Sequence, residues 1–132
     1  MLIVQAPLAD VIRRLQTEGC PGNVLIIDHP ATGYYIQIAG GIDSPHLHVE
    51  AVSNRFLEPD RQLSPEREKT LEQLGWAAPA KGCPNHAIDC QSHGDEDRQW
   101  LSNLIEKTFS SVYGISDRNA LVMKLSLEIE FA

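Results

Sequence analysis

The 132-residue sequence lacks the features that mark several large classes of protein. Beyond the opening segment its apolar runs are no longer than Val24–Ile27, far shorter than the roughly 20 residues that a membrane-spanning helix needs. The opening segment MLIVQAPLAD has no basic region and an apolar run of only Leu2–Val4, so no secretory signal is recognisable. Three cysteines, an odd number, do not make a disulfide framework. We therefore expect a cytoplasmic protein with reduced thiols and no membrane contact.

Basic residues are also scarce. The chain has 11 Lys and Arg against 18 Asp and Glu, which gives a formal net charge of −7. Binding to nucleic acid depends on clustered cations that neutralise phosphates. Here the basic residues are scattered, and the nearest approach to a cluster is Arg13–Arg14. The composition therefore argues against nucleic acid and against an anionic membrane surface as partners.

The common catalytic motifs are missing as well. The sequence contains no G-x-S-x-G, no P-loop, no dinucleotide-binding glycine pattern and no H-E-x-x-H. Glu50 and Asn54 are polar residues close together, but no third residue turns them into an acid/base pair. We expect a protein that is not an enzyme and that holds no cofactor.

Three segments have the apolar spacing of amphipathic helices. The first carries an i, i+3, i+4, i+7 stripe and stops at Gly19. The second opens with Ser64 as N-cap and Pro65 as the first helical residue, and runs to about Leu74. The third occupies residues 95–113. Trp76, just after the second helix, and Trp100, on the third, are expected to anchor helices in the core. A groove-lining role is the alternative for both.

Four segments are typical of strands. Val24–Asp28 and Tyr34–Ala39 are separated by a turn with proline and glycine, and residues 45–57 follow as a third run. Apolar residues alternate with polar ones from Leu121 to Phe131, which predicts a half-buried strand. Residues 77–95 have no such period and are expected to be irregular. The prediction is a single α+β domain over residues 1–132, with helices on an antiparallel sheet made of a meander and a C-terminal strand.

The segment KGCPNHAIDCQSH within residues 77–95 raises the question of a metal site. Cys83 and His86 have C-x2-H spacing, and Cys90 and His93 repeat it. Zinc sites of this kind normally join two close pairs through about a dozen residues. Here only three residues separate His86 from Cys90. We therefore favour a surface loop without metal, and keep a small zinc-binding protein using these four residues as the alternative.

A second candidate group lies in the third strand run. His46, His48 and Glu50 share one face of the predicted strand, with Asp43 nearby. Two histidines at i and i+2 can hold a metal ion. The solvent face of an antiparallel strand carries polar residues for simpler reasons, however, and the sequence identifies no further ligand from another element. We expect an exposed strand face here.

The stretches YYIQIAG, LHVEAVSNRFL and LSPEREKTLEQLGW, followed by the Pro84–Asn85 turn, occur in an order that resembles a known family. This is the group of YbjN-like domains related to type III secretion chaperones, called TY-Chap, and the resemblance covers about residues 32–113. Glu50, Asn54 and the Leu74-Gly75-Trp76 helix end agree with it in type and order. The family's tryptophan after the Pro-Asn turn is replaced here by His86.

The resemblance implies a bacterial, non-enzymatic module that holds peptides or unfolded segments of a protein client. Glu50, Asn54 and Trp76 are the residues that it offers as partner-binding. Related secretion chaperones pair as homodimers, so the resemblance also allows a dimer. A purely structural homodimeric subunit is the remaining alternative.

Overall fold

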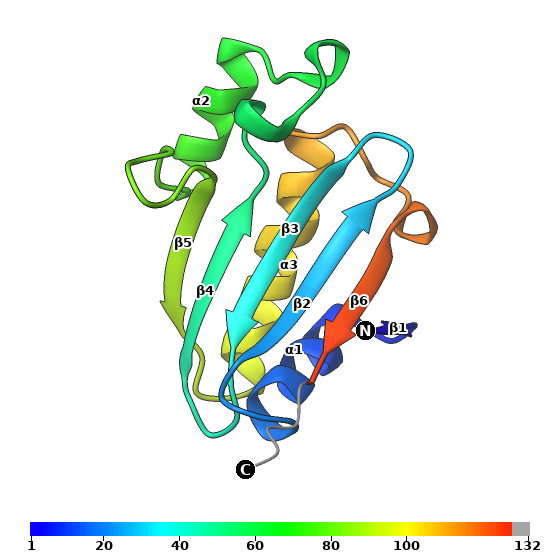
Figure 1. Ribbon diagram of the computed structural model, residues 1–132, viewed down its shortest axis with the longest axis vertical. Helices are drawn as coiled ribbons and strands as arrows, with labels where there is room; N and C mark the ends of the chain where they lie inside the picture. Colours follow the sequence, from blue (N-terminus) through cyan, green and yellow to red (C-terminus); the bar gives the residue numbers. More distant parts are fainter. Residues whose placement is uncertain (128–132) are drawn as a thin grey trace.

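The structure is a computed structural model, and it describes residues 1–127 (Figure 1). Along the chain the elements are β1 (Leu2–Val4), α1 (Leu8–Thr17), β2 (Asn23–His29), β3 (Tyr34–Gly40), β4 (His46–Ala51), the 3-10 turns η1 (Asn54–Phe56) and η2 (Pro59–Arg61), α2 (Pro65–Gln73), β5 (His86–Gln91), α3 (Asp95–Ser111), η3 (Arg118–Ala120) and β6 (Val122–Ser126). The predicted α+β class is confirmed.

The strands form one antiparallel sheet in the order β1-β6-β2-β3-β4-β5. The run from β2 to β5 is a meander, since each strand pairs with the next one along the chain. Strand β6 returns from the far end of the chain to pair with β2, and β1 adds to its other side. The predicted combination of a meander with a late strand is confirmed. Residues 128–131 of the predicted last strand lie outside the described part of the chain.

The expectation that residues 77–95 are irregular is wrong in part. His86–Gln91 form β5, which pairs with β4 from His46↔Gln91 to Ala51↔His86. The segment HAIDCQ has too few β-branched and aromatic residues to predict a strand from its own composition. The neighbouring strand supplies the missing information, because β4 presents a row of backbone donors and acceptors that this segment satisfies. Strand β1 was missed as well, because three residues are too short to show a period.

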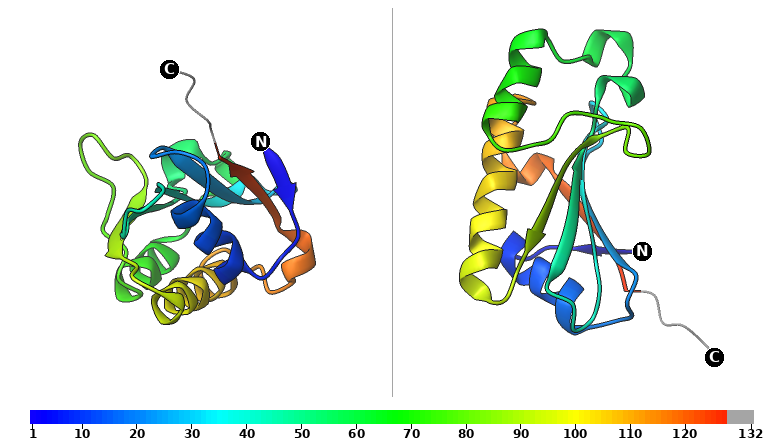
Figure 2. Two further views of the ribbon diagram at one scale, coloured as in Figure 1. Left: turned by 90° about the horizontal axis from the view of Figure 1, so that it is seen from below. Right: turned by 90° about the vertical axis from the view of Figure 1, so that its left-hand side faces the viewer.

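All three helices lie on one side of the sheet (Figure 2). Helix α3 crosses behind the meander and contacts α1, while α2 sits at the end of the sheet where β4 stops. The core between helices and sheet is made of large side chains that are almost fully buried: Ile12, Leu15, Leu25, Ile36, Ile38, Leu47, Leu71, Trp76, Leu101, Ile105, Phe109 and Leu125. Each such side chain stabilises the fold by about 1.5–3 kcal/mol relative to exposure.

The second helix begins as its sequence predicts. The side-chain oxygen of Ser64 accepts a hydrogen bond from the backbone N–H of Arg67 at 3.3 Å, and Pro65 is the first helical residue. Beyond its end, Trp76 is 2% exposed, as predicted for a core anchor. The prediction for Trp100 is wrong, because this residue is 56% exposed. It lies one position before Leu101, and 100° of helix rotation carries it off the buried stripe.

Within residues 1–127, no helix has the length and apolar character that crossing a membrane requires.

Candidate functional site

One face of the sheet carries no helix within residues 1–127 (Figures 1 and 2). Because side chains alternate along each strand, every second residue points to this open face. The alternation is clear in β4, where His46, His48 and Glu50 are outward and Leu47 and Val49 are buried. The face that lacks a helix layer is therefore built from the outward positions of the long strands, which are half-buried in β2 and β3 and partly exposed in β4 and β5. It divides into two parts of different character.

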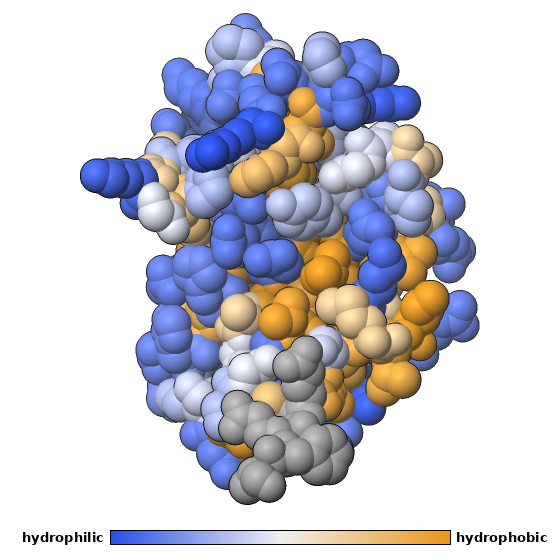
Figure 3. All heavy atoms as spheres, viewed as in Figure 1, coloured by the Kyte–Doolittle hydropathy of each residue, from blue (hydrophilic) through white to orange (hydrophobic). Residues whose placement is uncertain are grey.

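The apolar half of the open face lies over β1, β6 and β2, where hydrophobic side chains gather in Figure 3. Its outward residues are Ile3, Val24, Ile26 and Val122, and register places Ile3 and Ile26 on either side of Lys124. The ammonium of Lys124 lies 3.4 Å from the Asp28 carboxylate, so the charge of Lys124 is paired within the sheet. Apolar side chains that a monomer leaves unburied on one surface are candidate contacts for another chain.

The polar half of the open face lies over β4 and β5. Asp89 accepts hydrogen bonds at 2.9 Å from the Nε2 nitrogen of His46 and from the Nδ1 nitrogen of His48. The bond from His48 is the main cause that lowers the pKa of Asp89 below its ordinary value, and the bond from His46 adds to it. The Nε2 nitrogen of His48 faces Glu50, with an Nε2–Oε2 distance of 3.4 Å. These four residues form one connected cluster across two strands.

A short hairpin covers the end of the polar half that contains Glu50. Ala80 and Cys83 exchange two backbone hydrogen bonds, of 2.9 and 3.0 Å, around a Lys81–Gly82 turn. Gly82 has φ +86°, a left-handed conformation that favours glycine. The hairpin directs the Cys83 thiol to Glu50, with Sγ 4.0 Å from Oε1.

Asn85 fastens this hairpin to the sheet. Its side-chain oxygen accepts from the backbone N–H of Ser53 at 3.0 Å. Its amide nitrogen donates to the Tyr35 hydroxyl at 3.1 Å and to Glu50 Oε1 at 3.4 Å. Asn85 is 5% exposed, so these bonds satisfy a buried amide. The Pro84–Asn85 turn is thus a structural clamp that fixes both Cys83 and Glu50.

The two edges of the sheet differ. At β5, the backbone of Ala87 exchanges hydrogen bonds of 2.8 and 3.1 Å with Ala77, which covers part of that edge. At β1, the exposed side chains are Met1, Leu2 and Ile3, which are 56–71% exposed. An apolar edge strand is a template for pairing with another extended chain.

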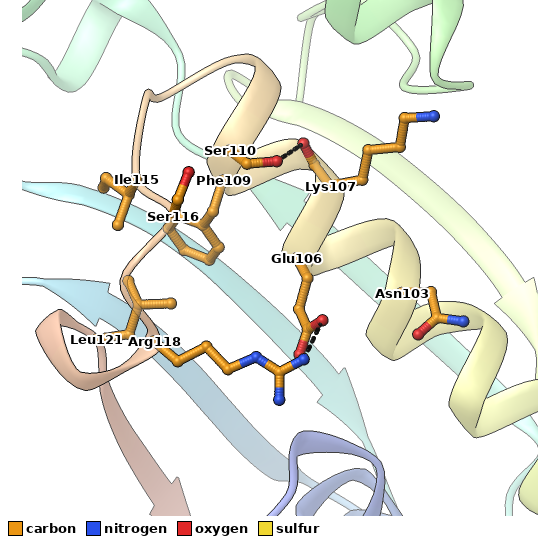
Figure 4. A pocket seen from close by; sticks show the side chains of 9 residues that line it. All are labelled: Asn103, Glu106, Lys107, Phe109, Ser110, Ile115, Ser116, Arg118 and Leu121. Carbon is orange, nitrogen blue, oxygen red and sulfur yellow. Dashed lines mark hydrogen bonds and ion pairs between the residues drawn. The ribbon is translucent and has the colours of Figure 1, made fainter.

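A separate hollow of about 420 Å³ lies on the helix side, between α3 and the segment that leads into η3 (Figure 4). Phe109 and Leu121 form its apolar wall, and an ion pair of Arg118 with Glu106 closes one side. The hollow contains an exposed ion pair and no convergent set of reactive groups. It has the character of a surface groove more than of a catalytic pocket.

The three residues that the sequence offered for partner binding have different surroundings. Glu50 lies on the open face. Asn54 exchanges two hydrogen bonds with the backbone of Leu63, at 2.6 and 3.1 Å, and so holds the chain between η1 and α2. Trp76 lies in the core and donates its indole N–H to Thr108. Of the three, Glu50 is therefore the one that lies on the open face, and the other two hold the framework together.

The structure does not bring Cys83, His86, Cys90 and His93 together. Because His86 and Cys90 lie on β5 with their side chains on the helix-facing side, they point away from Cys83, which lies over the open face. His86 is 2% exposed, and burial lowers the pKa of its imidazole below the ordinary value, against the opposing charges of Glu68 and Glu72. Strand geometry therefore separates ligands that look adjacent in the sequence.

A different group of metal-ligating residues comes together instead. His48, Glu50 and Cys83 each offer a ligand atom, and these atoms lie within 4.8 Å of one another. The alternation of β4 indicates that His48 and Glu50 share a face, but nothing in the sequence indicates that Cys83 and Asp89 join them. That information exists only in the pairing of β5 with β4 and in the hairpin before it.

The chain matches a known protein family over nearly its whole length. The family model described as "TY-Chap3: T3SS (YopN, CesT) and YbjN peptide-binding chaperone 3" matches residues 4–126. The chain matches no curated protein and no solved structure.

Proposed function

Because the chain belongs to the T3SS and YbjN peptide-binding chaperone family, we propose that it is a non-enzymatic, chaperone-like module that binds an extended segment of a client protein on the open face of its sheet. The proposal includes a bacterial, cytoplasmic setting, as for a chaperone that holds segments before they are exported or assembled. The client is a protein or peptide, and no cofactor takes part.

The observation that carries the proposal is the asymmetry of the sheet. Helices cover one side of the sheet and enclose the core. On the other side Val24 and Ile26 are half-buried, and no helix among residues 1–127 covers them. Apolar side chains of a client can bury against this half. An extended client can also add to the apolar edge at β1 through main-chain hydrogen bonds, the mode known as β-augmentation.

Charge favours one class of client segment. The chain carries a formal charge of −7, and the polar half of the open face contains Glu50 and Asp89. A strongly acidic segment would be repelled there, whereas a neutral or basic segment with alternating apolar residues would fit. We therefore expect clients of the second kind.

The test is suppression of aggregation without nucleotide, combined with peptide-array binding. We expect the chain to keep a denatured client soluble and to select array peptides with apolar residues and low negative charge. Replacing both Val24 and Ile26 with threonine keeps the β-branched shape that suits a strand but removes apolar contact. This change should weaken client binding about tenfold, the equivalent of ~1.4 kcal/mol.

The matched control is Trp100→Gln, which removes a large exposed apolar side chain from α3, away from the open face. It should leave client binding unchanged. Equal losses in both variants would show non-specific hydrophobic adhesion. The proposal is refuted if the protein binds no partner above background, either on peptide arrays or in lysate of its own host.

The exposed edge at β1 favours one second candidate, a structural homodimeric subunit. Met1, Leu2 and Ile3 offer apolar contact, and among residues 1–127 no strand pairs with the outer side of β1. Light scattering of the purified chain separates the two functions when it is combined with the array. A stable dimer that binds no peptide supports the structural subunit, and peptide binding by monomer or dimer supports the chaperone-like module.

A further inference from the structure

The geometry of the polar half suggests a binding site of another kind, which does not depend on the proposed function. Three side chains from two separate parts of the chain converge there: His48 and Glu50 from β4, and Cys83 from the hairpin. The distance from His48 Nε2 to Glu50 Oε2 is 3.4 Å, and that from Cys83 Sγ to Glu50 Oε1 is 4.0 Å. Ligand atoms around a tetrahedral Zn²⁺ ion are about 3.3–3.6 Å apart, given bond lengths of about 2.0–2.3 Å. The His48–Glu50 distance is within this range, and the Cys83 sulfur has to move a few tenths of an ångström closer to bind.

The surroundings of His48 match those of a metal ligand. Its Nδ1 nitrogen lies 2.9 Å from Asp89 Oδ1. A proton on Nδ1 donated to this carboxylate leaves the lone pair of Nε2 free, and Nε2 is the ring nitrogen that faces Glu50. Histidines that bind metals usually donate their other ring N–H to a carboxylate or carbonyl in this way, which fixes both the tautomer and the ring orientation.

The carboxylate of Glu50 is also held in place. Asn85 donates to Oε1 at 3.4 Å, and Gln37 donates to Oε2 at 3.3 Å. Both donors are neutral amides, so they orient the carboxylate without cancelling its charge. The Glu50 side chain is 19% exposed, which partly shields it from water. Glu50 is therefore held in a fixed position beside the thiol.

We propose that His48, Glu50 and Cys83 bind a divalent transition-metal ion, with Zn²⁺ as the best fit, and that Asp89 positions His48 for this role. Imidazole, carboxylate and thiolate are all zinc ligands. Two anionic ligands with one neutral imidazole balance the charge of the ion, after the thiol has released its proton to solvent. Three protein ligands leave a fourth position for water or for a donor atom of another molecule.

This site is distinct from the four-residue set of the 81–93 segment, with which it shares only Cys83. The difference makes the two sets separable by substitution. Cys83→Ser, Glu50→Gln and His48→Gln remove ligands of the proposed site. Cys90→Ser and His93→Asn are the matched controls, since they remove a thiol and an imidazole that lie outside it. All five positions are partly or fully exposed, and the circular dichroism and thermal melt of each variant report whether it folds.

The experiment is a zinc competition titration against a chromophoric chelator, with protein purified without a histidine tag. A parallel titration with Co²⁺ gives a thiolate-to-cobalt charge-transfer band in the ultraviolet if sulfur is a ligand. We expect one ion per chain, a cobalt band that Cys83→Ser abolishes, and zinc affinity weakened at least about tenfold in each ligand variant. Asp89→Asn should keep the cobalt band but weaken zinc about 10–100-fold. The controls should behave as the wild type.

Two results would overturn the proposal. The first is loss of binding in Cys90→Ser and His93→Asn together with Cys83→Ser, which would assign the ion to the 81–93 segment. The second is the absence of saturable one-to-one binding at micromolar zinc. In that case the cluster is a network of hydrogen bonds that joins His48 to Asp89 and Glu50 to Asn85.

Discussion

The indole nitrogen of Trp76 donates a hydrogen bond to the hydroxyl oxygen of Thr108, at 3.1 Å, inside the core. This bond joins the segment after α2 to the last turn of α3. Both residues are almost completely buried, at 2% and 0% exposed. The family's conspicuous helix-end tryptophan therefore stabilises the framework that carries the open face, which gives it a role other than contact with a client.

Thr108→Val tests this relationship. The variant keeps the shape of the side chain but removes the acceptor, so the indole N–H is left buried without a partner, at a cost of about 1–3 kcal/mol. The measurement is the free energy of unfolding in urea. Thr17→Val is the matched control, because the Thr17 hydroxyl makes the same bond to a backbone oxygen four residues earlier as that of Thr108, but is exposed. The control should change the unfolding free energy by less than about 0.5 kcal/mol.

His86 should make the fold sensitive to acid. Its pKa is lowered in the folded state because burial disfavours the charged imidazole, so the unfolded chain binds a proton at a higher pH than the folded chain. Stability is then intact above the ordinary histidine pKa of about 6.5 and falls as the pH drops from there toward the lower folded value. His86→Leu removes this loss.

The check is urea unfolding of wild type and His86→Leu at several pH values between 5 and 8. The variant's advantage should grow as the pH falls, by at most about 1.4 kcal/mol per pH unit. His93→Asn, at an exposed position, should follow the wild type. A constant difference between wild type and His86→Leu across the range would contradict a neutral, buried imidazole.

The thiols should differ in reactivity. Burial raises the pKa of Cys90, and the nearby carboxylates of Asp89 and Asp97 raise it further. Because the thiolate is the reactive species, Cys90 should be alkylated slowly near neutral pH. Cys83 lies over the open face and should be modified first, as measured by mass spectrometry of a timed iodoacetamide reaction. Equal labelling rates at the two sites would show that Cys90 is accessible and readily ionised.

Gly41 should be intolerant of any side chain. A Cβ atom at this position would clash with the backbone oxygen of Pro21, so Gly41→Ala forces two backbone segments apart. We expect a loss of stability of about 1–3 kcal/mol, in the range seen for overpacking. Gly22→Ala is the control beside the same contact, because a Cβ there meets nothing within 4 Å. Thermal unfolding of both variants checks the prediction, and equal melting temperatures would refute it.

Extended apolar patterns made much of the fold predictable. The stripes of α1 and α3, the Ser64 cap of α2 and the alternation of β4 all follow from local sequence, because a period of 3.6 or 2 is imposed by backbone geometry. The resemblance to the TY-Chap family, recognised from Leu74-Gly75-Trp76 and the Pro84–Asn85 turn, is also confirmed, because the family model matches residues 4–126. One domain over residues 1–132 stays a prediction, for which coincident unfolding transitions by two probes would be the evidence.

Strand β5 could not be predicted from local sequence patterns. Its residues have little β-propensity of their own, and they form a strand because β4 presents an unpaired edge. That pairing turns His86 and Cys90 inward and leaves Asp89 outward beside His46 and His48. A compact Cys/His segment therefore became two groups of residues on opposite faces of a sheet.

The sequence alone determined the α+β class, most helix and strand positions, and the family, since each depends on neighbours along the chain. Tertiary structure alone decided which residues share the open face, why Trp76 and Asn54 belong to the framework, and how Cys83 reaches Glu50. The physical reason is that strand register and a hairpin join residues 33 to 41 positions apart. Local propensity contains no information about such pairings.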